Sequence, residues 1–171
     1  MFTTTEGAET GLDANEVRSL LNGSGLPSSA AVEAVYSWRD GTQTAEVSLD
    51  DSHLFPGFYL LSLEDSILNY RAFVGNPRWS PGWLPLFANG GGDFYVVDLG
   101  SEPSGLVRHF RIDETEHPIE FTSLDGMLTT VMAGFERTLF FVDGDGYLEM
   151  DELAFAVVAA ELNPHVPWWV E

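Results

Sequence analysis

The chain of 171 residues contains no cysteine and no lysine, and it has no apolar run long enough to cross a membrane. Without cysteine there can be no disulfide framework, no thiol nucleophile and no thiolate metal site. A membrane-spanning helix needs about 20 consecutive apolar residues, so we expect none. Residues 1–6 lack the basic start and the apolar stretch of a secretory signal. Together these absences predict a cytoplasmic protein that does not enter membranes.

Positive charge is scarce, because 7 arginines face 27 aspartates and glutamates and leave a formal net charge of −20. A surface of this sign repels nucleic acids and anionic membranes, and it speeds the encounter with a cationic partner. No basic stripe suited to nucleic acid occurs along the chain. An acidic surface also keeps a protein in solution without any specific partner. The charge therefore bears on what the protein binds or avoids, and not on its fold.

Capping and apolar residues predict helices on both sides of the middle of the chain. Asp13 is a suitable N-cap for a helix that ends near residues 22–23, with Leu20 and Leu21 on its inner face. Ser62 is a suitable N-cap for a later helix whose apolar face ends at Val74. The same signals predict further helices over residues 28–38, 123–135 and 151–162.

The segment from residue 79 to residue 99 is the most informative part of the chain. Two apolar runs, 83–88 and 94–97, flank the sequence Asn89-Gly90-Gly91-Gly92. Consecutive glycines supply the positive φ angles that a tight reversal needs, so this segment predicts a β-hairpin. Further strands are predicted over residues 58–63, 106–112 and 119–121.

The order of these elements predicts an α+β fold in a single domain over residues 12–171, after a flexible tail over residues 1–11. The strands are close in sequence and joined by turns too short for parallel crossovers, so they must pair antiparallel. Helices precede and follow them, which places a central, mainly antiparallel sheet between N-terminal and C-terminal helices. A chain of this length can bury a sizeable core.

Over about residues 12–163, and most strongly in the hairpin, the chain resembles the SUKH superfamily. The Leu-Ser-Leu-Glu-Asp sequence at residues 61–65 is similar to a helix entry of that family, whereas residues 42–53 match none of its pattern. The superfamily includes fungal regulators of cell-wall glucan synthesis and bacterial immunity proteins. The resemblance therefore implies an α+β fold and a role in binding proteins rather than in catalysis. The hairpin residues that carry it are Trp79, Trp83, Leu84, Pro85, Gly91, Gly92, Asp93, Asp98 and Leu99.

Two of those residues, Asp93 and Asp98, flank the second strand of the hairpin. A pair of carboxylates can act as acid and base, but no nucleophile or base partner is tied to them in the sequence. We expect Asp93 to cap the turn and Asp98 to accept backbone N–H groups at the strand end. The chain also lacks a Gly-x-Ser-x-Gly elbow and a phosphate-binding loop, so we expect no enzyme activity.

Residues 141–152 are similar to an EF-hand calcium loop, but no register fits. With Gly146 as the sixth residue, Phe141 stands first, where the loop needs an oxygen ligand. With Asp143 first, Leu148 replaces the required glycine. We favour a glycine-rich turn followed by an N-capped helix, and we expect no metal or other cofactor. No metal-ligand spacing relates the four histidines, which are His53, His109, His117 and His165.

These observations predict a non-enzymatic protein-binding domain. Among such roles we favour an immunity protein that neutralises a secreted bacterial toxin. Many such toxins are nucleases with cationic active surfaces, and acidic residues would steer such a toxin onto its inhibitor. A regulatory or scaffold role in cell-wall synthesis or signalling is the alternative. Local acidity selects the candidate contact residues, which are Asp113, Glu114, Glu116, Asp143, Asp145 and Glu149.

Overall fold

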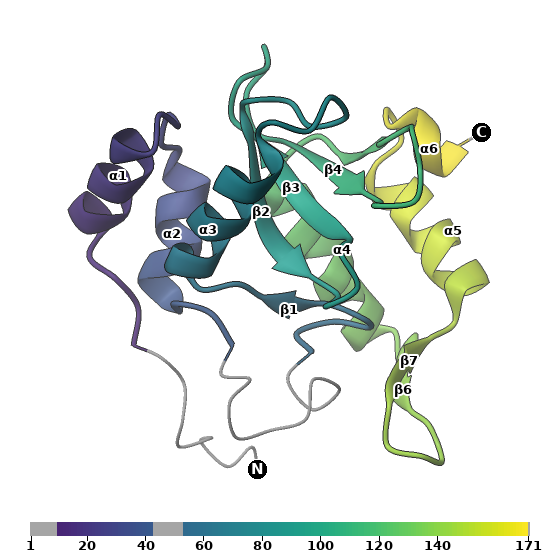
Figure 1. The fold of residues 1–171 in the computed structure, drawn as a ribbon. Coiled ribbons are helices and arrows are strands. Elements are labelled where there is room, and N and C mark those ends of the chain that lie inside the picture. Colours follow the sequence, from purple (N-terminus) through teal and green to yellow (C-terminus); the bar gives the residue numbers. More distant parts are fainter. Residues whose placement is uncertain (1–9, 43–52, 171) are drawn as a thin grey trace.

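A five-stranded antiparallel sheet lies at the centre of the fold (Figure 1). The computed structural model describes residues 10–42 and 53–170. The strands follow one another across the sheet in chain order, which confirms the predicted α+β class and the antiparallel pairing. Each strand is connected to the next one by a turn, a loop or a single helix, and no parallel crossover occurs between them. The strands are β1 (Tyr59–Leu60), β2 (Trp83–Ala88), β3 (Phe94–Asp98), β4 (Leu106–Phe110) and β5 (Ile119–Phe121).

Helices precede and follow the sheet, and side-chain caps set where most of them begin. Asp13 accepts the Asn15 N–H at 2.9 Å and Ser62 accepts the Asp65 N–H at 3.1 Å, as their positions predict. A cap satisfies backbone donors that have no partner within the helix. The helices are α1 (Ala14–Gly23), α2 (Ala30–Trp38), α3 (Leu63–Phe73), α4 (Leu124–Glu136), α5 (Glu152–Leu162) and α6 (Pro167–Val170).

The buried side chains around the sheet form two clusters. Helix α4 packs against one face (Figure 1), where Val97, Phe121 and Met127 belong to the larger core cluster. Both faces of β2 are covered, so all of its residues are buried. The second cluster is largely aromatic and consists of Leu61, Trp79, Trp83, Ala88, Phe94, Val96 and Phe110.

Helix α3 lies beside the edge of β2 (Figure 1). Because β1 pairs only with Phe87 and Ala88, the earlier carbonyl groups of β2 need other partners. The buried Ser66 hydroxyl donates to the carbonyl of Pro85, a residue whose missing N–H suits an edge position. Covering this edge blocks its pairing with a second chain.

Several boundaries differ from the predictions. The strand predicted over residues 58–63 is only Tyr59–Leu60, because the chain leaves the sheet before Ser62 caps α3. Leu20 and Val74 are exposed, although their spacing predicts inner positions. Helical spacing defines the direction of an apolar face but not how much of it a neighbour covers. The last element, α6, is too short for its pattern to be detected.

A small hairpin occupies the predicted glycine-rich break between α4 and α5. It consists of β6 (Phe140–Val142) and β7 (Leu148–Met150), which form a separate two-stranded sheet that protrudes from the fold (Figure 1). The turn is as predicted, but its strands are not. Three-residue strands contain too few positions to establish an alternating pattern.

The predicted tail over residues 1–11 lies mostly outside the described residues. Its last two residues belong to the packed structure. Thr10 forms an isolated bridge with Arg39, and the Leu12 N–H donates to the Tyr36 carbonyl at 2.8 Å. A Cβ on Gly11 would lie 1.9 Å from the Ser37 carbonyl oxygen. These contacts tie the last two residues of the predicted tail to the end of α2.

Candidate partner-binding surface

The six carboxylates predicted to contact a partner lie on two separate segments. Asp113, Glu114 and Glu116 are exposed on the loop between β4 and β5. That loop lies near α6, because Arg111 at its start contacts the Trp168 ring. The remaining three belong to the β6–β7 hairpin, at the opposite end of the molecule from α6 (Figure 1). The structure therefore does not bring the six together into one patch.

Arginines hold the loop between β4 and β5. The Arg78 guanidinium donates to the carbonyl oxygens of Ile112 and Glu114, at 2.7 and 2.8 Å. Arg111 pairs with the Glu114 carboxylate at 3.2 Å. Among the described residues, no ion pair involves Asp113 or Glu116. Two of the three predicted carboxylates on this loop are therefore uncompensated.

The three predicted carboxylates of the β6–β7 hairpin have different roles. Asp143 Oδ1 accepts the N–H groups of Asp145 and Tyr147, both at 2.9 Å, so this carboxylate closes the turn. Asp145 and Glu149 are exposed and make no ion pair within the described chain. Glu149 pairs across the hairpin with Phe141. It therefore shares a face with an exposed aromatic ring.

A β-hairpin stands where the EF-hand similarity suggests a calcium loop. Phe141, the first residue of one loop register, lies in β6. Asp143, the first residue of the other register, accepts two hydrogen bonds within the turn. Asp151 caps α5 by accepting the Ala154 N–H at 3.0 Å, which matches the favoured alternative. Within the described part of the chain, no three His, Asp or Glu side chains are grouped as metal ligands.

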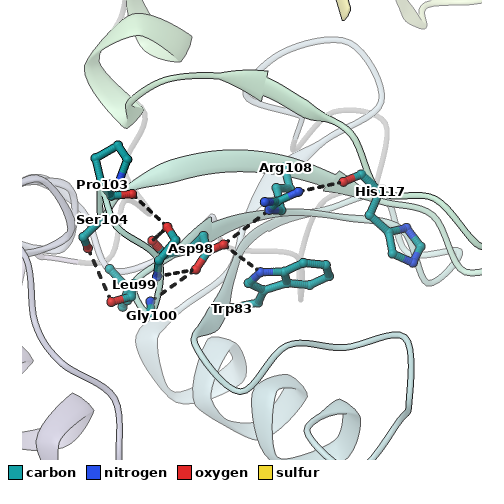
Figure 2. Close-up of polar contacts among 9 residues, drawn as sticks. Trp83, Asp98, Leu99, Gly100, Pro103, Ser104, Arg108 and His117 are labelled. Atoms are coloured by element: carbon teal, nitrogen blue, oxygen red, sulfur yellow. Dashed lines mark hydrogen bonds and ion pairs between the residues drawn. The ribbon is translucent and has the colours of Figure 1, made fainter. Parts of the chain in front are cut away.

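The Asp98 carboxylate is buried at the end of β3 and joins three segments (Figure 2). Its Oδ2 accepts the Trp83 indole N–H at 3.0 Å and the Arg108 Nε at 3.3 Å. Its Oδ1 accepts the N–H groups of Gly100 and Ser101, at 3.2 and 3.0 Å. These four donors match the acceptor positions of a carboxylate. The predicted role of Asp98 at the strand end is confirmed.

Arg108 extends this network across the sheet (Figure 2). Its guanidinium lies 5.4 Å from the centre of the Trp83 ring, and Nη1 donates to the His117 carbonyl at 3.2 Å. A cation over an aromatic face adds to the ion pair with Asp98. The network therefore fixes β2, β3, β4 and the segment before β5 relative to one another.

Side chains also close the glycine turn between β2 and β3. Asn89 Oδ1 accepts the N–H groups of Gly91 and Asp93, at 2.7 and 3.1 Å. Asp93 accepts from the Asn89 side chain and from the Ile112 N–H, each at 2.9 Å. Gly92 has φ of 105°, as a tight reversal requires. Asp93 thus caps the turn as predicted, and it also anchors the end of β4.

Five other residues that carry the SUKH resemblance are buried, whereas Gly91 in the turn is exposed. Their side chains fill the core on the two faces of the sheet, so they stabilise the fold and offer no surface to a partner. Asp93 and Asp98 likewise bond the chain itself. Those buried residues are Trp79, Trp83, Leu84, Pro85 and Leu99.

A buried titratable cluster around Glu120 is not predicted by the sequence. Val107 pairs with Phe121 and Arg108 pairs with Ile119, so Glu120 is the extra residue of a β-bulge. Regular alternation puts Glu120 on the face opposite its neighbours. The bulge breaks that alternation, and Glu120 is 2% exposed. Nothing local in a three-residue strand indicates such a bulge.

Side chains from β3 and β4 meet the Glu120 carboxylate. The Tyr95 hydroxyl donates to Oε2 at 2.8 Å, and His109 Nδ1 lies 3.1 Å from Oε1. Arg111, just after β4, approaches Oε1 at 3.6 Å. The His109 and Tyr95 rings stack with centres 4.6 Å apart. Such pairing offsets the cost of burying a carboxylate.

Helix α6 closes this cluster from the C-terminal side. The Trp169 indole N–H donates to the Glu120 carbonyl, and the Arg111 guanidinium lies 5.1 Å from the Trp168 ring centre. The cavity beside Tyr95 has a volume of about 40 Å³. Small-molecule sites span about 300–1,000 Å³, so this space is too small for a substrate. The cluster instead joins three strands to the last helix.

Stability is expected to fall as the pH rises above about 10. Burial, and then the Glu120 charge, raise the pKa of Tyr95 well above its ordinary value, and burial raises the pKa of Tyr36. The unfolded chain then loses these protons before the folded chain does, at a cost of about 1.4 kcal/mol per pH unit for each tyrosine. Urea unfolding between about pH 8 and pH 11 measures this slope, which Tyr95→Phe should make shallower. An unchanged slope in that variant would contradict the assignment.

No family model matches this chain, and a search of curated proteins finds no similar sequence. Across residues 10–42 and 53–170, no helix is both long and apolar enough to cross a bilayer. The surface and the charge of the molecule therefore carry the functional inference.

Proposed function

We propose that the chain is a non-enzymatic immunity protein that binds and neutralises a cationic toxin in the cytoplasm. The observation that carries this proposal is a surplus of exposed negative charge. The formal net charge is −20. Four of the seven arginines are paired with carboxylates, namely Arg18 with Glu33, Arg108 with Asp98, Arg111 with Glu114 and Glu120, and Arg137 with Glu161. Few arginines are therefore left to compensate the other carboxylates.

The proposed mechanism is electrostatic steering followed by occlusion. An acidic surface attracts a cationic domain and aligns it before contact, which raises the association rate. A nuclease must hold phosphates on a cationic surface, and an acidic inhibitor can occupy that surface in place of the nucleic acid. The resemblance to the SUKH superfamily supports a role in protein binding, and the absence of cysteine suits a reducing compartment.

The affinity for the partner is expected to fall about tenfold or more between about 0.05 M and 0.5 M salt, because salt screens exposed charges. The tagged chain would be used to capture proteins from its host, and mass spectrometry would identify them. Calorimetry with the purified partner at both salt concentrations then measures the dissociation constant. A dissociation constant that does not respond to salt would contradict electrostatic steering.

Toxicity tests the biological role separately. Expression of the captured protein alone should arrest growth, and co-expression of this chain should restore it. A captured partner that is harmless alone and acts in cell-wall synthesis or signalling would instead support the regulatory or scaffold role. Failure of the chain to retain any cationic protein at low salt would contradict both the immunity proposal and its charge mechanism.

A further inference from the structure

The β6–β7 hairpin exposes several large apolar side chains to solvent. Phe141 is 49% exposed and Tyr147 is 46% exposed, and Val142 on the same hairpin is also exposed. Helix α5 follows directly and exposes Leu153, at 84%, together with Val157 one turn later. Exposed apolar groups gathered on one segment are typical of an interaction site.

One face of the hairpin is anchored to the core. The Phe140 ring packs against Phe135 and Phe155, with centres 4.8 and 5.4 Å away. It also fits against Gly134, where a Cβ would come within 2.4 Å of the ring. The Asp151 N–H donates to the Leu139 carbonyl at 2.9 Å, which ties the end of the hairpin to its start. A two-stranded hairpin is marginal alone, and this packing holds it in place.

The other face of the hairpin is exposed to solvent. Side chains alternate along a strand, so Phe141 lies on the face opposite the buried Phe140. Its cross-strand neighbour Glu149 shares that face. Tyr147, which directly precedes β7, lines a groove together with Glu149. This places two aromatic rings beside an exposed carboxylate on a preorganised support. Preorganisation lowers the entropy cost of binding.

The charges around these rings indicate the chemistry of the partner. Residues 141–153 contain no arginine, lysine or histidine. No ion pair among the described residues compensates the acidic side chains of this segment. A surface with an apolar centre and several acidic side chains around it is complementary to apolar side chains flanked by cations. The acidic side chains are Asp143, Asp145, Glu149, Asp151 and Glu152.

A groove beside the hairpin provides a place for one such cation. Its volume is about 220 Å³, and it runs between β7 and the segment that includes His53, Pro56 and Gly57. Tyr147, Leu148, Glu149, Met150 and Glu152 line it on the hairpin side. A guanidinium can stack on an aromatic ring and pair with carboxylates at the same time. The groove therefore suits an arginine side chain inserted from a partner.

We propose that the outer face of the β6–β7 hairpin, with this groove, is the docking site for a protein segment that carries arginine flanked by apolar side chains. The inference rests on the proposed function and identifies its contact surface. The larger groove between α1 and α3, about 510 Å³, mixes Glu64 and Asp65 with Arg71 and thus favours neither sign of charge. The loop between β4 and β5 is acidic, but Arg111 compensates part of it.

A short synthetic peptide in which arginine alternates with leucine is the probe. Two-dimensional NMR of the ¹⁵N-labelled full chain should show peptide-induced shifts concentrated in residues 140–153. The double variant Phe141→Ser/Tyr147→Ser should weaken peptide binding about tenfold or more, as truncation of interface anchors does. Glu149→Gln/Glu152→Gln keeps the shape of the surface and should also weaken binding. A peptide with glutamate in place of arginine should not bind.

Leu20→Ser/Leu68→Ser is the matched control, because both side chains are exposed on the α1–α3 side. It should leave the peptide affinity unchanged, and circular dichroism should show that every variant is folded. Shifts centred elsewhere, no shifts at all, or equal binding by the hairpin variants would overturn the assignment. If both hairpin variants still captured the same cationic protein from the host, this docking site would be wrong while the proposed function stood.

Discussion

Replacement of Asp98 by alanine is expected to lower the free energy of unfolding by about 3–5 kcal/mol, the usual cost of removing one member of a buried ion pair. The carboxylate is 5% exposed and accepts four hydrogen bonds. Its loss leaves the Trp83 indole N–H and the Arg108 guanidinium without their acceptor. Each buried donor left unpaired costs about 1–3 kcal/mol. The turn after β3 also loses the acceptor for its backbone N–H groups.

Urea unfolding of three variants measures this effect. Asp98→Asn keeps the shape and one acceptor oxygen, so it should lose about half as much stability as the alanine variant. Asp113→Ala removes an exposed carboxylate of the same size and should change stability by less than about 0.5 kcal/mol. A loss below about 1 kcal/mol for Asp98→Ala would show that the network in Figure 2 does not support the fold.

Replacement of Glu120 by glutamine should destabilise the protein by about 2–4 kcal/mol, although it changes neither size nor shape. The neutral amide offers one acceptor oxygen, whereas both carboxylate oxygens face donors. Tyr95 donates to Oε2, and Arg111 and His109 approach Oε1. The amide N–H groups would then point at some of these donors.

Glu114→Gln is the matched control for this prediction, because Glu114 pairs with the same arginine but is 53% exposed. It should change stability by less than about 0.5 kcal/mol, as exposed ion pairs usually do. A double-mutant cycle of Glu120→Gln with Tyr95→Phe should give a coupling energy of about 1 kcal/mol or more. Equal effects of the two glutamine variants would contradict the role of the buried cluster.

The helix starts and the central hairpin could be predicted because their signals are local. Asp13, Ser62 and Ser123 each accept an N–H within three residues, so neighbouring positions contain the whole interaction. The turn between β2 and β3 is similar, since Gly90 and Gly92 adopt the positive φ angles that their lack of a side chain allows. Short turns between strands then required antiparallel pairing.

The Glu120 cluster could not be predicted, because its members come from different strands and meet through a bulge. Alternation in residues 119–121 directs Glu120 away from the core, and only the pairing of β5 with β4 reverses this. The same limit applies to the acidic residues predicted to contact a partner. Local composition selects both Glu114 and Glu149, yet Glu114 is paired with Arg111 and Glu149 lies beside an exposed aromatic ring.

The sequence by itself determined the net charge, the antiparallel α+β order and the capped helix starts, since each depends on composition or on residues a few positions apart. Only the tertiary structure decided which carboxylates are compensated and which apolar side chains stay exposed. It also showed that the predicted glycine-rich turn joins the two strands of a protruding hairpin. The physical reason is that burial and ion pairing depend on neighbours far away in the chain, and packing alone brings those neighbours together.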